Sequence, residues 1–97
     1  MTIAIATFRC QPGKREGWLD YLAGPDGLAK TRAFDGCGGI ETIVAQGSED
    51  VVLYERWASV EHHQAYVAWR LDNGLGELLE AVLASPLEFA YFDETPI

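Results

Sequence analysis

Hydrophobic residues along the chain fall into short blocks. Within some blocks they recur at every second position, and within others at every third or fourth position. Blocks of alternating or β-branched apolar residues predict strands, and blocks with apolar residues three or four positions apart predict helices. Glycine and proline clusters separate the blocks, as at Gln11-Pro12-Gly13 and Ser85-Pro86. The predicted strands are residues 2–10, 40–45, 51–57 and 87–92, and the predicted helices are residues 14–23, 28–33, 60–71 and 75–84.

The order of these blocks is β-α-β-β-α-β, with an additional helical stretch in each crossover. This order is typical of an α+β protein of the ferredoxin-like type with an antiparallel sheet. Right-handed crossovers then place all the helices on one face of the sheet. A length of 97 residues fits one domain, so we expect a single domain over residues 1–97.

The predicted strands are apolar on both faces. In the third strand, Val51 and Leu53 alternate with Val52 and Tyr54, which are also apolar or aromatic. A sheet face in contact with water is mostly polar, so an uncovered apolar face indicates an interface. We therefore expect a homodimer in which two copies pack sheet against sheet. The alternative is that the strands are too short for the alternation of apolar and polar residues to be clear, in which case the second face need not be an interface.

The balance of charge limits the class of partner. The net charge is −8, from 15 acidic and 7 basic residues, which disfavours nucleic acid and anionic membrane surfaces as partners. No apolar run is long enough to span a bilayer, and no secretory leader is evident at the start of the sequence. Cys10 and Cys37 are expected to be free thiols, which favours a cytoplasmic location.

Two sequence features that could suggest a cofactor or metal site, a glycine cluster and a pair of histidines, have the wrong spacing for that role. Gly36, Gly38 and Gly39 cluster in a predicted loop that leads into a strand, whereas a phosphate-binding loop leads into a helix. His62 and His63 are adjacent on a predicted helix, so their side chains point about 100° apart and chelate one ion poorly. We therefore expect no metal site and no cofactor.

The helix over residues 60–71, with Ser59 as its expected N-cap, carries the candidate site. His62, Tyr66 and Trp69 are spaced at i, i+4 and i+7, which predicts one inward-facing stripe. Aromatic residues with polar tips that face inward need partners or line a cavity. The alternative is that His62 is a hydrogen-bonded interior histidine and that the two aromatic residues are core packing. The other side of the helix is expected to face solvent and carries Glu61, Gln64 and Arg70.

Three stretches of the sequence carry a family resemblance. They are residues 8–14 at the end of the first strand, residues 31–37 before the second strand, and residues 55–66, which match the pattern Glu-x-Trp-x-Ser-x-x-x-His. On these stretches the chain resembles the antibiotic biosynthesis monooxygenase domain family, within the dimeric α+β barrel superfamily. The resemblance covers nearly the whole chain.

The resemblance implies a homodimer with a pocket between the sheet and the helices of each subunit. It also implies oxidation of a small quinol-like or polycyclic phenolic substrate by molecular oxygen, without metal or flavin. Haem-degrading relatives have an asparagine in the first strand and a histidine in the later helix. This chain has neither, and its later helix has Leu78 and Leu79 instead, which argues against haem degradation.

The resemblance and the residue chemistry together suggest roles for the candidate residues. His62 is the expected base, and Tyr66 and Trp69 are expected to hold substrate or peroxide oxygens. The residues expected to contact the substrate are Phe8, Arg32, Phe34 and Trp57.

Two other functions remain open for the same fold. One is a non-catalytic dimeric binding or scaffolding domain, and the other is a cyclase or isomerase acting on a polyketide-like aromatic. An enclosed cavity of several hundred Å³ in contact with His62, Tyr66 and Trp69 would favour an enzyme. A filled core at that place would favour a scaffold.

Overall fold

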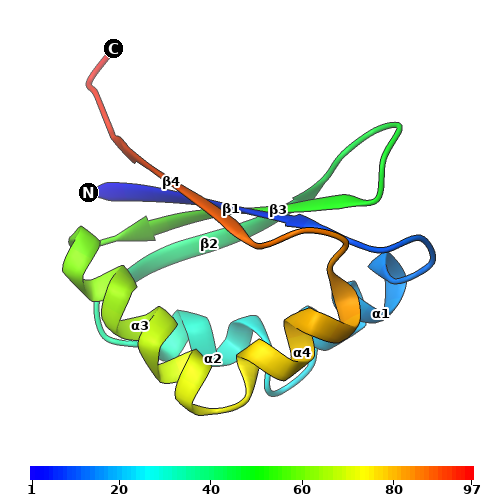
Figure 1. Ribbon diagram of the computed structural model, residues 1–97. Coiled ribbons are helices and arrows are strands. Elements are labelled where there is room, and N and C mark those ends of the chain that lie inside the picture. The colour runs from blue at the N-terminus through cyan, green and yellow to red at the C-terminus, as the bar shows by residue number, and fades with distance from the viewer.

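The computed structural model describes residues 1–97 and has the predicted α+β architecture (Figure 1). In chain order the elements are β1 (Thr2–Arg9), α1 (Arg15–Ala23), α2 (Leu28–Ala33), β2 (Cys37–Val44), β3 (Asp50–Trp57), α3 (Val60–Asp72), α4 (Leu75–Val82) and β4 (Glu88–Asp93).

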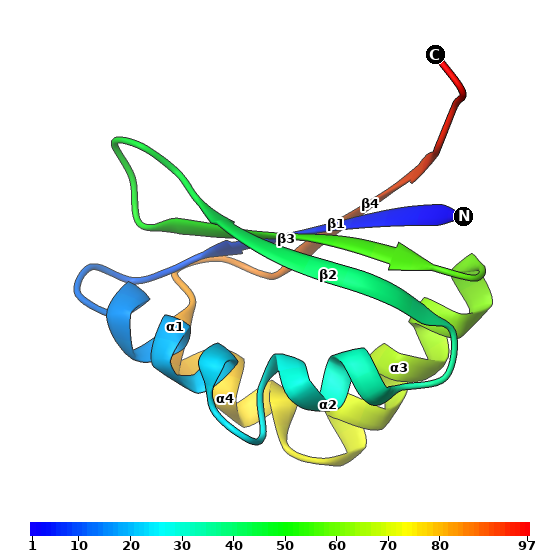
Figure 2. The same ribbon diagram turned by 180° about the vertical axis from the view of Figure 1, so that it is seen from behind.

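The four strands form one antiparallel sheet in the order β2-β3-β1-β4. All the helices cover the same face of this sheet, and the opposite face carries none (Figures 1 and 2). This arrangement confirms the ferredoxin-like fold and the placement of both crossovers on one side. No helix is both long enough and apolar enough to cross a membrane.

Local signals explain where the helices of the second crossover begin and pack. The Ser59 side chain accepts a hydrogen bond from the His62 backbone N–H at 3.2 Å, which caps α3 as predicted. Helix α4 turns one apolar stripe toward the core, as the spacing of its leucines predicts. That stripe consists of Leu75, Leu78, Leu79 and Val82.

Strand β2 begins three residues earlier than the sequence predicts, at Cys37 instead of Ile40. The glycines that indicate a loop instead form an irregularity in the register between Cys37 and Gly39. A side chain at Gly38 would overlap Met1, and Gly39 has a positive φ of 144°. Glycine at these positions lets the chain enter the sheet, which the sequence pattern alone does not show.

Helix α3 is rotated relative to the prediction. Its buried residues are His63 and Arg70, whereas His62 and Trp69 are only partly buried. The prediction that Arg70 faces solvent is therefore wrong. The two polar residues can face inward because each finds hydrogen-bond partners on distant segments, as described below.

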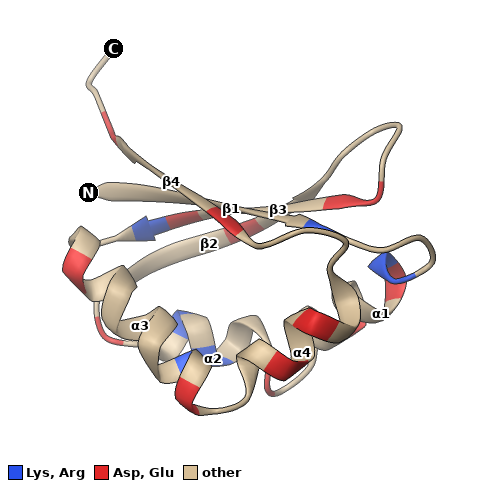
Figure 3. Ribbon diagram, in the orientation of Figure 1, with Lys and Arg blue, Asp and Glu red and all other residues tan.

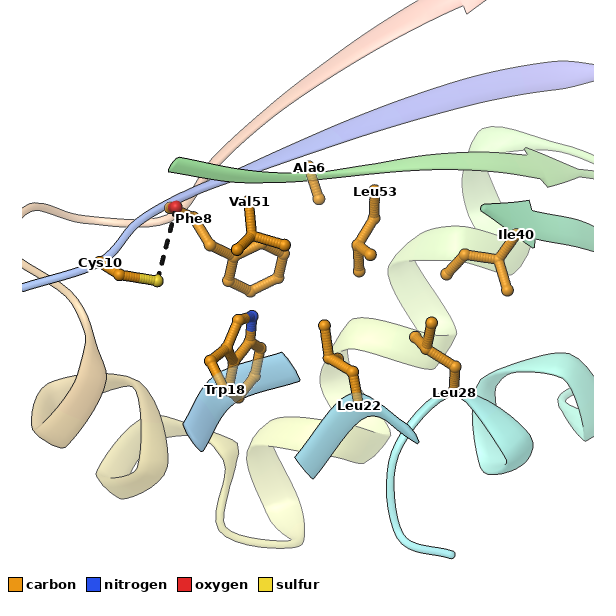
Figure 4. Packing of buried hydrophobic residues seen from close by; sticks show 9 residues of the cluster. All are labelled: Ala6, Phe8, Cys10, Trp18, Leu22, Leu28, Ile40, Val51 and Leu53. Atoms are coloured by element: carbon orange, nitrogen blue, oxygen red, sulfur yellow. Dashed lines mark hydrogen bonds between the residues drawn. The ribbon is translucent and has the colours of Figure 1, made fainter. Parts of the chain in front are cut away.

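The core lies between the sheet and the helices (Figure 4). Trp18 of α1 packs on Phe8 of β1 with ring centroids 5.0 Å apart, so it joins a helix to the sheet. The buried cluster consists of Ala6, Phe8, Cys10, Trp18, Leu22, Leu28, Ile40, Val51 and Leu53.

The helix-free face of the sheet is apolar at its centre. Ile5 lies between Tyr54 of β3 and Ala90 of β4, and Val52 lies opposite Ile43 of β2. Ile43 is 56% exposed in the single chain. Acidic residues are dispersed over the fold, and the few basic residues include two close together on α2, Lys30 and Arg32 (Figure 3). The strands are thus apolar on both faces, as the sequence predicts.

Candidate functional site

A small cavity of about 40 Å³ lies between the sheet and the helices. This volume has room for a few water molecules, since one water needs roughly 10–15 Å³ on this measure. Its walls are mostly aliphatic and aromatic, and they include three polar or charged residues, Thr31, Glu55 and Arg70, together with the hydroxyl-bearing rings of Tyr21 and Tyr66. Trp18 also lines the cavity, and its indole Nε1 has no hydrogen-bond partner. The candidate site is built on these groups.

Glu55 is a buried carboxyl group on the helix-covered face of β3. It is 2% exposed, and its Oε1 accepts a hydrogen bond from Trp57 Nε1 at 2.9 Å. Burial raises the pKa of Glu55 to about 7, against the opposing effect of the Trp57 hydrogen bond. A carboxyl group that titrates near neutral pH is suited to accept and release a proton.

His63 lies beside Glu55 and is fully buried. Its Nδ1 is 2.7 Å from the hydroxyl oxygen of Tyr91, and its Nε2 is 3.7 Å from Glu55 Oε1. Nε2 has no hydrogen-bond partner. Burial lowers the pKa of His63 to about 4, so the ring is neutral at physiological pH.

Arg70 supplies a buried positive charge at the cavity. Its guanidinium donates to the Asp26 and Gly27 carbonyl oxygens, each at 2.8 Å, to the Tyr66 hydroxyl at 2.7 Å and to Thr31 Oγ1 at 3.1 Å. All these acceptors are neutral, so the charge has no ionic partner among them and favours an anion nearby.

Tyr66 is held by the same network. Its hydroxyl is 2.6 Å from Thr31 Oγ1 and accepts from Arg70 Nε. Burial raises the pKa of the Tyr66 hydroxyl, while the hydrogen bonds with Thr31 and Arg70 act in the opposite direction. Tyr66 therefore stays a neutral phenol that fixes the position of the guanidinium.

Only two of the seven residues that the sequence predicts for the site line this cavity, Phe8 and Tyr66. Trp57 is fully buried and packs on Tyr66 with ring centroids 5.2 Å apart. Phe34 and Trp69 share an open hollow on the surface.

Arg32 lies away from the cavity, on the exposed side of α2. Its guanidinium donates to the Ile40 carbonyl oxygen at 3.3 Å. Arg32 therefore does not line the cavity, and nothing in the structure supports its predicted contact with a substrate oxygen.

His62 lies outside the cavity, with its side chain 40% exposed. Its Nδ1 is 2.7 Å from Ser59 Oγ, and its Nε2 is 3.7 Å from Asp35 Oδ2. The order of these groups is that of a serine-hydrolase triad, but the serine caps α3 and the Asp35 side chain is 93% exposed. His62 also lines none of the cavities, so we see no nucleophilic site there.

The sequence analysis does not single out Glu55, His63 or Arg70, although a signal exists for two of them. Glu55 has the same strand parity as Leu53 and Trp57, which places its carboxyl group inward. The histidine of the Glu-x-Trp-x-Ser-x-x-x-His pattern, four residues after Ser59, is His63. No local signal identifies Arg70, because its acceptors are carbonyl groups more than 40 positions away.

The residues do not form a metal centre. No three side chains of histidine, cysteine, aspartate or glutamate come together in a way that could hold a metal ion. The chemistry available at the cavity is therefore that of the Glu55 carboxyl group, the Arg70 charge and the neutral hydrogen-bonding groups.

Solved structures share this fold at low sequence identity. A monooxygenase from the gene ActVA-Orf6 of Streptomyces coelicolor, in complex with Nanaomycin D, is 18% identical with a TM-score of 0.81, covering 99% of this chain and 88% of that one. The NE2512 protein of Nitrosomonas europaea, of unknown function, is 17% identical with a TM-score of 0.78, covering 99% and 94%. A structure described as an antibiotic biosynthesis monooxygenase is 20% identical with a TM-score of 0.77, covering 99% and 100%.

These similarities show the fold and do not identify a substrate. No curated protein sequence matches the chain. The family model described as "Antibiotic biosynthesis monooxygenase" matches residues 1–69, which is well over half of the sequence. The chain therefore belongs to the antibiotic biosynthesis monooxygenase family.

Proposed function

We propose that this protein is a monooxygenase that uses molecular oxygen, without metal or flavin, to oxidise a small quinol-like or phenolic substrate. The observation that carries the proposal is a buried carboxyl group, Glu55, with a pKa of about 7 in the wall of an aromatic-lined cavity. An electron-rich phenolate can reduce oxygen itself, so the protein needs to deprotonate the substrate, orient it and exclude water.

In the proposed reaction, ionised Glu55 takes the proton of the substrate hydroxyl. The phenolate transfers one electron to oxygen, and the resulting radical pair joins through a new carbon–oxygen bond to give a peroxide. The peroxide takes the proton back from Glu55, and cleavage of the O–O bond with loss of the ring hydrogen then yields a quinone and one water molecule. One atom of oxygen thus enters the product, and the substrate supplies all the electrons.

Arg70 would stabilise the negative charge that forms in this reaction, and Trp18 would donate a hydrogen bond to an oxygen atom of the substrate or product. The guanidinium lines the cavity, donates only to neutral acceptors and would stabilise the phenolate and the reduced oxygen. The unpartnered Trp18 Nε1–H is available to a carbonyl or quinone oxygen. Tyr66 would act as a positioning residue for Arg70.

The role of base is assigned here to Glu55, whereas the sequence analysis assigns it to His62. Glu55 lines the cavity and His62 does not. The two assignments are separated by oxygen uptake and quinone formation with a panel of hydroquinones and anthrones. We expect Glu55→Gln to lower kcat by roughly 100-fold or more, which is the usual contribution of a general base, and His62→Ala to retain most of the wild-type rate.

Wild-type turnover by Glu55→Gln would contradict the assignment of the base to Glu55. Loss of turnover in His62→Ala, with the fold intact by circular dichroism, would support His62 instead. Failure of the wild-type protein to consume oxygen with any substrate in the panel would contradict monooxygenase function as a whole.

A second candidate function is favoured by the size of the cavity. A volume of about 40 Å³ is too small for an aromatic ring unless side chains move, and this suits a non-catalytic dimeric binding or scaffolding domain. The cyclase or isomerase alternative predicts product formation without oxygen uptake, so the same assay distinguishes it.

We also propose that the working unit is a homodimer formed through the helix-free face of the sheet. Support comes from the apolar centre of that face, including Ile5, Val52 and Ile43. Free thiols at Cys10 and Cys37 fit a cytoplasmic location. The acidic net charge makes a nucleic acid or an anionic membrane a poor partner.

A further inference from the structure

We propose that the substrate enters through a surface groove between α3 and β4, and that the Phe89 ring is the gate between this groove and the cavity. With the gate open, the groove and the cavity form one binding site for a neutral, flat aromatic molecule that carries a hydroxyl group. The inference rests on the proposed function for the position of that hydroxyl at Glu55, and it adds the place where the rest of the molecule binds.

The α3–β4 groove lies next to the cavity and is much larger. Its volume is about 290 Å³, against about 40 Å³ for the cavity. Helix α3 forms one wall, and the edge strand β4 forms the other (Figure 1). A small-molecule site usually has roughly 300–1,000 Å³, which the groove approaches and the cavity alone does not. The residues that line the groove are Gln64, Val67, Ala68, Leu71, Phe89 and Tyr91.

The wall between the groove and the cavity consists of two side chains. Val67 and Phe89 line both spaces. Two other surface hollows also meet the cavity, one through Leu87 and the other through the core residues Leu22 and Leu28. These three leucines are all more buried than Phe89. The α3–β4 groove is therefore the approach whose dividing wall is most accessible.

Phe89 is placed so that its ring can move without disturbing the core. It lies opposite Ala6 of β1, so its side chain is on the helix-covered face of the sheet. The residue is 38% exposed and is not part of the buried cluster. Its strand pairs with β1 alone, and its ring meets His63 edge to face with centroids 4.8 Å apart. Rotation of the ring toward solvent gives up this contact and joins the two spaces.

The lining of the groove indicates the class of ligand. No charged residue lines it, whereas Glu55 and Arg70 line only the cavity. A molecule that spans both spaces therefore has its hydroxyl group at the inner end and an apolar ring system at the outer end. Leu71, which is 55% exposed, would be covered by that ring system.

The gate accounts for the small volume of the cavity in the observed state. With Phe89 in its observed position, the groups that would react are separated from the groove. Return of the ring behind a bound substrate would exclude water from the reacting groups, as the proposed chemistry requires. The proposed dimer uses the opposite face of the sheet, so it leaves the groove open.

The first test measures the binding of 2-naphthol, a neutral two-ring phenol. The indole N–H of Trp18 lines the cavity and has no hydrogen-bond partner, so its NMR signal reports the arrival of a ligand there. The backbone amide of Ala68 reports occupation of the groove. In the wild type we expect 2-naphthol to shift both signals with one common Kd. A shift at Ala68 without one at Trp18, or no binding at millimolar 2-naphthol, would overturn the proposal.

A matched pair of variants tests the groove itself. Ala68 and Ala65 are both exposed on α3, but Ala68 lines the groove and Ala65 lines none of the cavities. Ala68→Trp fills the groove, so we expect it to raise the Kd for 2-naphthol about tenfold or more. Ala65→Trp should bind as the wild type does. Equal Kd values in all three proteins would exclude the groove as part of the site.

A second pair tests the gate. Phe89→Ala removes the ring that separates the two spaces, so we expect the association rate of 2-naphthol in stopped-flow fluorescence to rise about tenfold or more. Phe92→Ala is the control, because Phe92 lies opposite Ile3 on the other face of the same strand. The proteins are compared at equal oligomeric state by sedimentation. A wild-type rate in Phe89→Ala, or an equal rise in Phe92→Ala, would show that Phe89 is not the gate.

The outcomes separate this proposal from the proposed function. If both pairs behave as expected but the wild type consumes no oxygen with the quinol panel, the groove and gate hold and the monooxygenase function fails. If the wild type oxidises a quinol and Ala68→Trp keeps the wild-type kcat/KM, the groove is overturned and the monooxygenase function stands.

Discussion

At the scale of single residues, Glu55 and His63 shift their pKa values in opposite directions for one reason. Both are buried, and burial disfavours the charged form of each. The folded protein holds the Glu55 proton up to a pKa of about 7 instead of 4.5, so between these values it binds more protons than the unfolded chain. Glu55 therefore makes the free energy of unfolding fall as pH rises from about 4.5 to about 7.

His63 has the opposite effect on the free energy of unfolding. Its pKa is lowered from 6.5 to about 4, so between these values the unfolded chain binds more protons. Stability from His63 therefore rises between about pH 4 and pH 6.5. In the wild type the two contributions largely cancel up to pH 6.5, and only the loss from Glu55 remains above it.

Replacement of Glu55 by glutamine should remove one side of this balance. Relative to wild type, Glu55→Gln should gain up to about 3 kcal/mol of unfolding free energy on going from pH 4 to pH 8, since each pKa unit is worth about 1.4 kcal/mol. Urea unfolding at fixed protein concentration across this range measures the difference. His63→Leu is the matched variant and should show the reverse trend, and parallel pH profiles for all three proteins would refute the assignment.

At the scale of elements, the turn between α2 and β2 depends on contact with the start of α3. Gly36 has a positive φ of 89°, and its carbonyl oxygen accepts from the Ala58 N–H at 2.8 Å. A Cβ on Gly36 would overlap the ring of His62. His62 thus has a defined structural role as the cover of this turn.

Gly36→Ala should therefore destabilise the fold more than Gly47→Ala does. Gly47 has a similar φ of 82°, but a Cβ there meets nothing within 4 Å. We expect Gly47→Ala to cost about 1–2 kcal/mol for the backbone alone, and Gly36→Ala to cost a further 1–3 kcal/mol, approximately, for the overlap. Urea unfolding of both variants checks this, and the excess should vanish in Gly36→Ala/His62→Ala. Equal costs for the two glycines would show that the contact with His62 contributes nothing.

The elements themselves were largely predictable, whereas the inward face of α3 was not. The period of the hydrophobic residues and the positions of helix-breaking glycine and proline are local properties of the sequence. Helix α2 and the N-cap Ser59 are therefore found where predicted. The rotation of α3 depends on which polar residues find partners across the fold. Arg70 finds the Asp26 and Gly27 carbonyl groups, and His63 finds Tyr91. The spacing of the aromatic residues Tyr66 and Trp69 instead selects His62 for the inward stripe and places Arg70 on the opposite side.

At the scale of the whole molecule, the helix-free sheet face is the feature that needs a partner. Its apolar centre is bordered by ion pairs, such as Arg9 with Glu88 at 2.7 Å. In a single chain this arrangement leaves Phe92 54% exposed. A second copy of the chain would cover both the apolar centre and these side chains.

We expect the wild type to sediment at twice the 10.7 kDa mass of one chain at micromolar concentration. Ile43→Glu places a charge on the helix-free face and should shift the protein toward monomer. Leu71→Glu is the control, because Leu71 is 55% exposed, almost as much as Ile43, but lies on the helix layer. A folded wild-type monomer, or equal dissociation in both variants, would contradict the proposed interface.

The sequence by itself determined the element order, the single-sided helix layer and the apolar character of both sheet faces, because these follow from local periodicity and the handedness of crossovers. Only the tertiary structure decided which groups meet at the cavity. Glu55, His63 and Tyr91 come from three separate elements, and the distances between them depend on how α3 rotates against the sheet. That rotation is set by polar groups finding partners far along the chain, which no local pattern records.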